Sequence, residues 1–359
     1  MALLLPRFRL NPLTAKKLRR FREIRRGYVS FVILMALIAL SLIAELLVNS
    51  RALVVRYEGK WFFPTYGAIH VGREFGLGYD YEVNYRELQA SFTAKPGTGN
   101  FAWLPLVPFN PYENSYPQEF YLPRRPNPSE RHFLGTDQLN RDVLARLVYG
   151  FRNALIFAGS FILLTYLVGV SLGCAMGYFG GWLDLVGQRL IEIWSLVPFL
   201  FVVIIVASIV SAYGGMNLGW LLAIVVLFSW TSITYYMRTN TYREKARDYV
   251  HAAQVLGAST TRIIFKHVLP NVLSTIVTFA PFTVASAISA LTALDFLGYG
   301  LPPPTPSWGE LLRQGTSNLN APWIVASAFS ALVVVLVLVT FIGEAVREAF
   351  DPKKFTTYR

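Results

Sequence analysis

Cysteine and charged residues are scarce in this chain of 359 residues. The single cysteine, Cys174, excludes a disulfide framework within the chain and a zinc site built from several cysteines. The four histidines are scattered without metal-ligand spacing, so we predict no metal site; they are His70, His132, His251 and His267. Charged residues make up only 15% of the chain, whereas soluble proteins carry about 25%.

Apolar residues are abundant instead, at 54% of the chain, and the formal net charge is +12. A basic balance in a soluble chain would suggest nucleic-acid binding. Such a chain would not also be this apolar and this poor in charge. The combination indicates a membrane protein whose charges lie outside its apolar spans, with lipid as a partner and without nucleic acid.

Six stretches are long enough to cross a bilayer, which takes about 20 apolar residues in a helix. They are residues 28–48, 154–176, 193–212, 218–236, 272–294 and 323–342. Five contain no charged residue, and the first contains only Glu45 near its end. We therefore predict an all-α membrane protein with six transmembrane helices. The first follows a long basic segment and precedes no small-residue cleavage site, so we expect it to remain as an anchor.

Lysine and arginine are concentrated on one predicted side of the membrane. Residues 1–27 hold nine basic residues and one acidic residue, and residues 238–271 hold six basic and two acidic. Because positive loops face the cytoplasm, we expect these segments and the tail 348–359 to be cytoplasmic. Residues 154–347 then carry five of the six spans, and the long segment 49–153 faces outward.

The outer segment 49–153 is too long for a structureless connection. It holds nine of the 20 prolines, and we expect 51–128 to form an irregular, aromatic-rich subdomain; a partly disordered loop is the alternative. Residues 139–150 predict an amphipathic helix in the membrane interface, with Asp142 paired to Arg146 at i,i+4.

The basic N-terminal segment carries an apolar residue at every third position, namely Leu18, Phe21 and Ile24. This spacing predicts an amphipathic helix on anionic lipid. The alternative is that the segment acts only as an orientation signal.

The segment between the fourth and fifth spans is the most informative. Residues 248–256 predict a short helix, Gly257 a turn, and Ser259 the N-cap of a second helix. The small residues Ala252 and Ala253 would allow close approach at this point of the chain. We predict a helix–turn–helix elbow on the cytoplasmic face, which a plain connecting loop would not need.

This elbow resembles the coupling motif of ABC importer permeases, which runs Glu-Ala-Ala, three residues, Gly, and then about a dozen residues to Leu-Pro. His251 stands where that family usually has glutamate. The resemblance implies that the elbow contacts an ATPase through these residues: Asp248, Tyr249, His251, Ala252, Ala253, Gly257, Leu269 and Pro270.

Other motifs resemble the peptide/nickel C class of these permeases: 134–137 (Leu-Gly-Thr-Asp), 141–146, 296–302, 307–310 (Ser-Trp-Gly-Glu) and 344–352. Residues 55–64 and the long outer segment resemble the Yej branch, which imports oligopeptides and peptide–nucleotide antibiotics of the microcin C type. A dipeptide or nickel importer permease is the alternative within the family.

The resemblance implies a type I importer permease fold in the bacterial inner membrane. It implies four kinds of partner: a second permease in a heterodimer, ABC ATPase subunits with two nucleotide-binding domains, a periplasmic binding protein, and a peptide substrate. The chain contains no Gly-x-x-x-x-Gly-Lys-[Ser/Thr] loop. We therefore expect no enzyme activity and no cofactor in this chain, with ATP and Mg²⁺ bound by the partner ATPase.

The fifth span holds the candidate residues of a substrate path, which are Thr278, Pro281, Ser286, Ser289 and Asp295. Hydroxyl residues could line a polar passage or simply permit close helix packing. Pro281, like Pro198 in the third span, predicts a kink, which serves either packing or the opening of a path. Asp295 could meet a peptide's amino terminus; alternatively it is a helix-end charge exposed to interface water or paired with the second permease.

Two other classes of protein fit less well. An ion-driven secondary transporter would show charged or broken-helix sites at mid-membrane together with internal repeats, and neither is clear. An intramembrane enzyme would need paired catalytic groups at depth, yet the spans contain no histidine and no aspartate.

Overall fold

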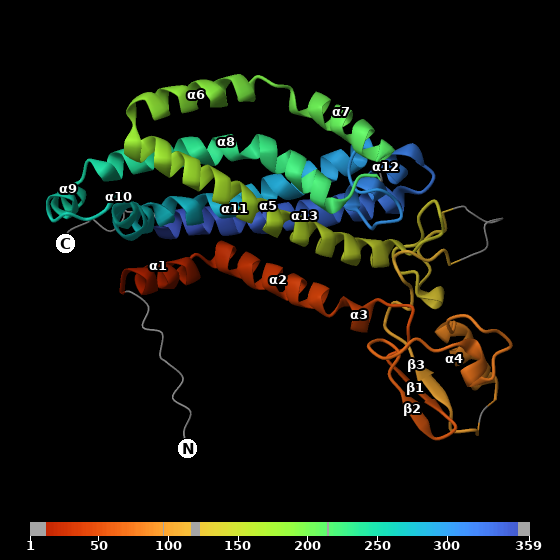
Figure 1. Ribbon diagram of the computed structural model, residues 1–359. Helices are drawn as coiled ribbons and strands as arrows, with labels where there is room; N and C mark the ends of the chain where they lie inside the picture. The colour runs from red at the N-terminus through yellow and green to blue at the C-terminus, as the bar shows by residue number, and fades with distance from the viewer. Residues whose placement is uncertain (1–11, 96, 116–122, 214, 351–359) are drawn as a thin grey trace, which may run out of the picture.

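The computed structural model describes residues 12–95, 97–115, 123–213 and 215–350. Long helices lie side by side in a bundle, and a small subdomain with strands is attached at one end (Figure 1). The first eleven residues of the predicted N-terminal segment, and most of the predicted tail, lie outside the described residues.

Among the described residues, five helical segments are long and apolar enough to cross a membrane: α2 (Arg25–Leu42), α5 (Val143–Phe179), α8 (Leu218–Lys245), Thr260–Leu297 and α13 (Pro322–Phe350). The fourth of these comprises α10 (Thr260–Arg262), the π-helical segment η4 (Ile263–Val268) and α11 (Leu269–Leu297). They agree with five of the six predicted spans.

The third predicted span is not one straight helix. α6 (Gly181–Ser195) and α7 (Phe199–Ala212) meet at a bend of 74° and form either one broken span or a re-entrant pair. Pro198 is the N-cap residue of α7. Because proline has no N–H to donate, it cannot continue the helix that precedes it, and the kink predicted at Pro198 is present as a break between two helices.

Close packing of α5 against α8 depends on three glycines spaced four residues apart, Gly169, Gly173 and Gly177. A Cβ atom at Gly173 would lie 2.6 Å from the carbonyl oxygen of Thr234 on α8. Small residues at this spacing let two helix backbones approach closely, which is the usual basis of helix association in lipid.

The main core lies between α5, α8, α11, α13 and the short outer helix α12 (Trp308–Ser317). α2 packs on α13. The N-terminal helix α1 (Pro12–Glu23) also packs on α13, and Phe21 is buried against Ile342, Ala345 and Ala349. The expected helix is present, but Phe21 is turned toward α13, and contact of this segment with anionic lipid stays a prediction.

The outer segment holds a three-stranded antiparallel sheet in the order β2-β1-β3, formed by Lys60–Phe62, Val54–Tyr57 and Phe101–Trp103. Glu58 and Gly59 both have positive φ at the β1–β2 turn, as a tight hairpin requires. The short helices of this segment are α3 (Ala44–Leu47), η1 (Gly72–Phe75), α4 (Tyr85–Ala94) and η3 (Pro128–Glu130). The expected subdomain thus contains a short sheet and one helix, and the described residues between these elements are irregular.

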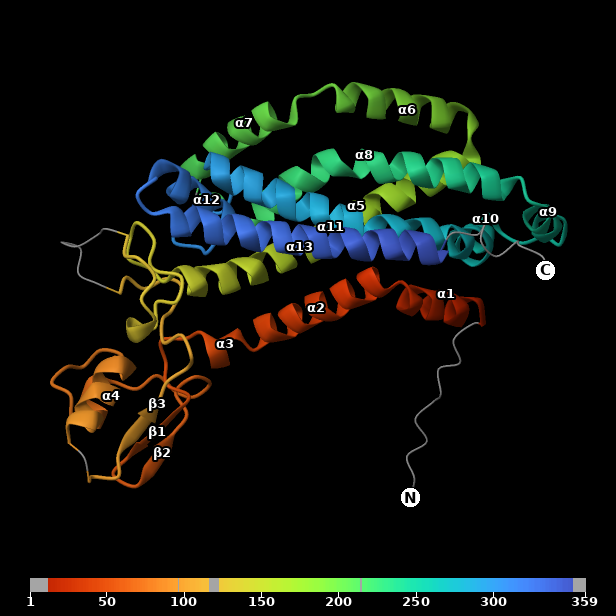
Figure 2. The ribbon, with the colours of Figure 1, turned by 180° about the vertical axis from the view of Figure 1, so that it is seen from behind.

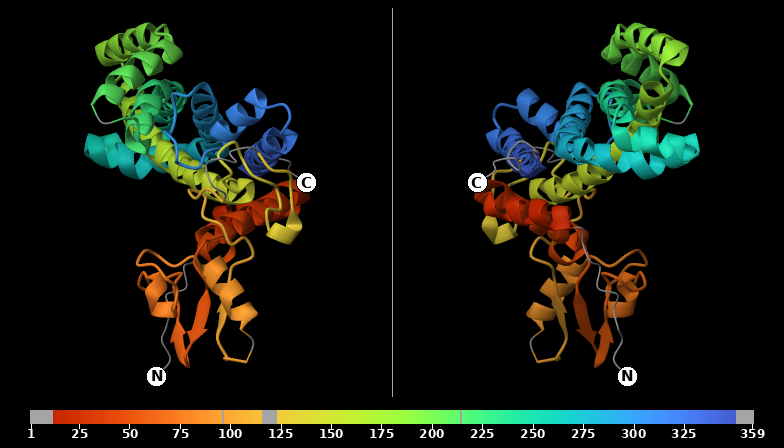
Figure 3. Two further views of the ribbon diagram at one scale, coloured as in Figure 1. Left: turned by 90° about the vertical axis from the view of Figure 1, so that its right-hand side faces the viewer. Right: turned by 90° about the vertical axis from the view of Figure 1, so that its left-hand side faces the viewer.

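One face of the sheet packs on α4 and forms a separate small core with Val55, Phe75, Tyr85, Leu88 and Ala102. This outer subdomain (residues 49–113) stands to one side of the bundle, next to the α2 side, as the end-on views show (Figure 3). Seen from behind, it occupies the end opposite to α9 (Asp248–Val255) and α10 (Figure 2).

The interfacial helix predicted over 139–150 does not exist as a separate element. α5 begins at Val143, is continuous into the span, and buries Val143 and Leu147 in the main core. Asp142 is its N-cap residue and accepts a hydrogen bond from the backbone N–H of Ala145. The predicted Asp142–Arg146 pair does not form, because both side chains have other buried partners.

Candidate functional site

The elbow between α8 and α11 lies at one end of the bundle (Figure 1). On its inner side, Val250 and Ala253 of α9 pack with Ile263 and Val268 against Tyr178 at the end of α5. This small core fixes α9 to the helices that continue into the spans.

The turn after α9 is built as the sequence predicts. Gly257 has φ +77°, and its N–H and that of Ala258 bond the carbonyl oxygens of Gln254 and Ala253. The Ser259 side chain accepts a hydrogen bond from the backbone N–H of Arg262 as the N-cap of α10. Residues 263–268 are π-helical, a local departure that is frequent at functional sites.

Tyr249 joins three segments of the elbow. Its hydroxyl donates to a Glu244 carboxylate oxygen at 2.6 Å at the end of α8, and accepts from Asn271 Nδ2 at 3.1 Å at the start of α11. Burial and this hydrogen bond to the Glu244 carboxylate raise the pKa of Tyr249 to about 12. The phenol therefore stays protonated at neutral pH and links the ends of two spans.

The outward face of the elbow is apolar and uncovered within the described residues. Val255 is 88% exposed and Leu256 86% exposed, at the tip of α9. His251 and Ala252 are exposed next to them, whereas Ala253 is turned inward. The predicted set includes Ala252 but not Val255 or Leu256, although two apolar residues directly before a turn glycine indicate an exposed apolar tip.

The remaining predicted elbow residues differ in how far they are exposed to solvent. Asp248 starts α9, where a negative charge favours the helix N-terminus, and it is exposed. Leu269 is partly buried and Pro270 exposed, in the first turn of α11, where proline fits because its missing N–H would be unbonded. All eight predicted residues thus lie in one elbow, and their role in coupling stays a prediction.

At the opposite end, buried charges join the start of α5 to α12. Arg141 donates to Asp137 at 2.8 Å and to Glu310 at 2.9 Å, and Arg146 pairs with the other oxygen of Glu310. Gln314 also donates to Glu310. Burial alone would lower the pKa of Arg141, but Asp137 and Glu310 raise it overall. The motifs at 134–146 and 307–310 therefore form one network, which we did not predict.

Asp295 is buried rather than exposed to interface water. Its two carboxylate oxygens accept hydrogen bonds from the backbone N–H of Leu301 and the hydroxyl of Ser307. The expectation of a water-exposed charge is wrong, because the loop that follows α11 folds back over this carboxylate. Asp295 orders that loop and borders a cavity of about 320 Å³, which Arg313 also lines.

The other candidate path residues lie along α11. Thr278 donates its hydroxyl to the carbonyl of Ser274, and Pro281 lies within the helix. Ser286 and Ser289 are exposed, and Ser289 borders a mostly apolar cavity of about 410 Å³. The structure therefore brings no pair of these hydroxyls together, and a substrate path along α11 remains a prediction.

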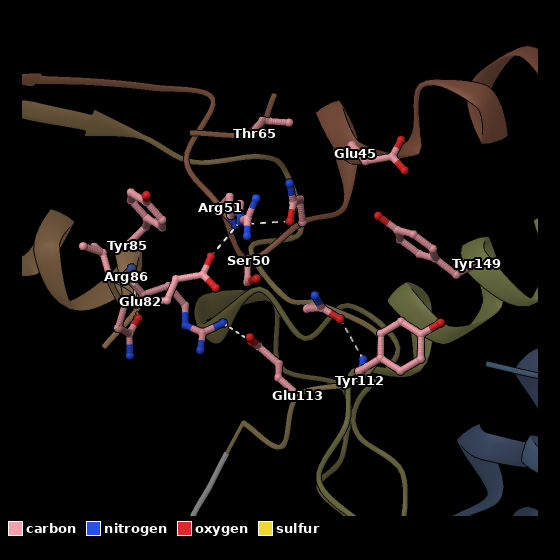
Figure 4. A pocket seen from close by; sticks show the side chains of 14 residues that line it. Glu45, Ser50, Arg51, Thr65, Glu82, Tyr85, Arg86, Tyr112, Glu113 and Tyr149 are labelled. Atoms are coloured by element: carbon pink, nitrogen blue, oxygen red, sulfur yellow. Dashed lines mark hydrogen bonds and ion pairs between the residues drawn. The ribbon is translucent and has the colours of Figure 1, made fainter. Parts of the chain in front are cut away.

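A second polar cavity, of about 620 Å³, separates the outer subdomain from the outer ends of α3 and α5. Figure 4 shows the acidic and basic side chains around it. Arg51 pairs with Glu82 at 2.7 Å, and Arg86 pairs with Glu113. Burial raises the pKa of Glu113, although Arg86 opposes the shift. These pairs connect segments of the subdomain to one another.

Among residues 12–95, 97–115, 123–213 and 215–350, no group of three or more His, Cys, Asp or Glu side chains could hold a metal ion. The fold and the elbow define a class: a multi-span membrane component with an exposed apolar tip at one end. Residues 169–356 match the family model described as binding-protein-dependent transport system inner membrane component. The chain belongs to this family of ABC transporter permeases.

Two of the relatives extend over nearly the whole chain, and a third extends over 70% of it. The inner membrane ABC transporter permease protein YejE of Escherichia coli is 42% identical, with 96% of this chain and 99% of that protein covered. The peptidoglycan transport system permease protein YejE of Agrobacterium fabrum is 37% identical, over 96% and 94%. The oligopeptide transport system permease protein OppC of Mycobacterium tuberculosis is 32% identical, over 70% and 84%.

Proposed function

We propose that this chain is a membrane-spanning subunit of an ATP-driven importer that carries oligopeptides across the bacterial inner membrane. The proposal for the substrate class is supported by the relatives, two of which are named for oligopeptide and peptidoglycan transport. Peptide–nucleotide compounds of the microcin C type are a further candidate substrate. A dipeptide or nickel importer is the alternative within the family.

The build of the elbow supports the proposed coupling of transport to an ATPase. Its inner side is fixed to α5 and α11 by a small core, while Val255 and Leu256 project outward. Burying an apolar tip of this kind in a groove of a partner protein would be favourable, because it removes apolar surface from water. In this proposal the partner is an ATPase that binds ATP and Mg²⁺, and its closure moves the elbow and the spans between two discrete arrangements.

If the elbow meets a cytoplasmic ATPase, the orientation of the chain and the positions of the other subunits follow. The elbow and both termini lie in the cytoplasm, and the outer subdomain lies in the periplasm with the substrate-binding protein. A second, different permease packs beside this chain. Exposed Ser286 and Ser289 on α11 are then available to face a shared substrate path.

The test is purification of the tagged chain in mild detergent, followed by mass spectrometry of its co-purifying subunits. The proposal expects a second permease and one or two ABC ATPase chains. A chain that purifies alone from an active membrane, while transport persists in an ATPase-depleted strain, would contradict it.

A further inference from the structure

The outer sheet has a second face, which no described helix covers. β1 turns Val55 toward α4 and therefore turns Arg56 to the opposite side, because successive residues of a strand alternate. Arg56 pairs across the sheet with Trp61 on β2 and with Phe101 on β3. These three side chains therefore form a row on the face away from α4.

This face is unusually aromatic for an exposed surface. Trp61 is 56% exposed and Trp103 65% exposed, and Phe101 also lies at the surface. The rings of Trp61 and Phe101 are edge to face, with centroids 5.7 Å apart, and the Arg56 guanidinium lies 5.7 Å from the Trp61 ring centroid. Exposed apolar patches of this kind mark an interaction surface.

The sheet lies close to the level at which the spans end. Figures 1 and 2 show the strands nearer than α4 to the level at which the spans end. In the end-on views the subdomain stands beside the bundle, and the bundle does not lie behind it (Figure 3). The aromatic face, on the side of the sheet away from α4, is thus turned toward that level, next to the outer end of α2.

We propose that Arg56, Trp61, Phe101 and Trp103 form a membrane-docking face that rests on the headgroup region of the outer leaflet. Tryptophan is enriched at membrane–water interfaces, where one part of the ring is apolar and the N–H remains wet. Arg56 meets lipid phosphates with a guanidinium that can form paired hydrogen bonds. The contact continues the lipid-facing surface of α2 and holds the subdomain against the membrane.

The test uses spin labels on the full-length chain in vesicles of phosphatidylethanolamine and phosphatidylglycerol. Cys174 is first replaced by alanine, and a single cysteine is then introduced by Phe101→Cys, on the docking face. The control is Thr93→Cys, which is exposed on α4, farther from the level at which the spans end. Power saturation measures how far oxygen, which enters lipid, and a water-soluble nickel chelate reach each label.

The proposal expects the label at 101 to lose accessibility to nickel chelate relative to detergent solution, and to become more accessible to oxygen, while the label at 93 stays aqueous. In a Trp61→Glu/Trp103→Glu background, the label at 101 should regain nickel accessibility, while an unchanged label at 93 shows that the subdomain is folded. Equal aqueous accessibility at 101 and 93 would overturn the proposal. So would protection at 101 that appears only after purified substrate-binding protein is added.

Discussion

Arg146 on α5 and Glu310 on α12 form a buried ion pair across 164 positions of sequence. Both side chains are almost fully removed from solvent, and Arg141 binds the second oxygen of Glu310. The pair therefore fixes the outer end of α5 to α12. It holds together the end of the bundle opposite to the elbow.

Removing the charge of Glu310 should destabilise the chain strongly, because Arg141 and Arg146 would remain buried with less compensation. We expect Glu310→Gln to cost about 3–5 kcal/mol in unfolding free energy. The measurement is thermal unfolding in detergent. The control, Glu82→Gln, breaks a partly exposed pair with Arg51 and should cost about 0–1 kcal/mol. Equal losses for the two variants would refute the structural role of the network.

The contact between α5 and α8 predicts a difference between two glycines of one helix. Gly173→Ala places a methyl group against the backbone of α8 and should cost about 1–3 kcal/mol. Gly159→Ala meets no atom within 4 Å and should be neutral or stabilising by about 0.5–1 kcal/mol. Both are measured by thermal unfolding, and a loss at position 159 as large as at 173 would contradict the packing.

The positive φ of Gly257 predicts that the elbow tolerates asparagine better than a β-branched residue. Gly257→Val should cost about 1–3 kcal/mol locally, because the left-handed conformation is strained for valine. We expect it to reduce substrate-stimulated ATPase activity of the assembled transporter. Gly257→Asn should retain most of that activity, since asparagine adopts this conformation more readily. Normal coupled transport by Gly257→Val would rule out the role given to this turn.

The exposed tip of α9 predicts a loss of assembly without a loss of folding. The double variant Val255→Ser/Leu256→Ser should unfold at the temperature of the native chain but co-purify with less ATPase. Leu319→Ser is the matched control, because Leu319 is 83% exposed and follows α12 at the other end. Undiminished ATPase recovery with the α9 double variant would place the docking surface elsewhere.

The length of the apolar runs was sufficient to predict most of the spans, because a membrane helix requires such a run whatever its neighbours are. The elbow was also predictable, since Gly257 and Ser259 act through their own backbone surroundings. The sequence predicts a kink at Pro198, but the bend of 74° depends on how the helices on its two sides pack, which one sequence does not give.

The buried charges were not predictable in the same way. Asp142 and Arg146 are four residues apart, which predicts a local pair, but tertiary partners override it: His132 binds Asp142 at 2.7 Å and Glu310 binds Arg146. The burial of Asp295 was not predicted for a similar reason, since only the folded loop brings Ser307 to its carboxylate. Contacts between distant segments determine the partners of these charged side chains, and a single sequence does not show which segments come into contact.

The most direct test of the central claim is uptake of a labelled oligopeptide into proteoliposomes that contain the purified complex and a saturating binding protein. The account predicts uptake that requires ATP on the elbow side, persists after collapse of the ion gradient, and falls in the Val255→Ser/Leu256→Ser variant. Uptake that proceeds without ATP and stops when the ion gradient is collapsed would contradict it.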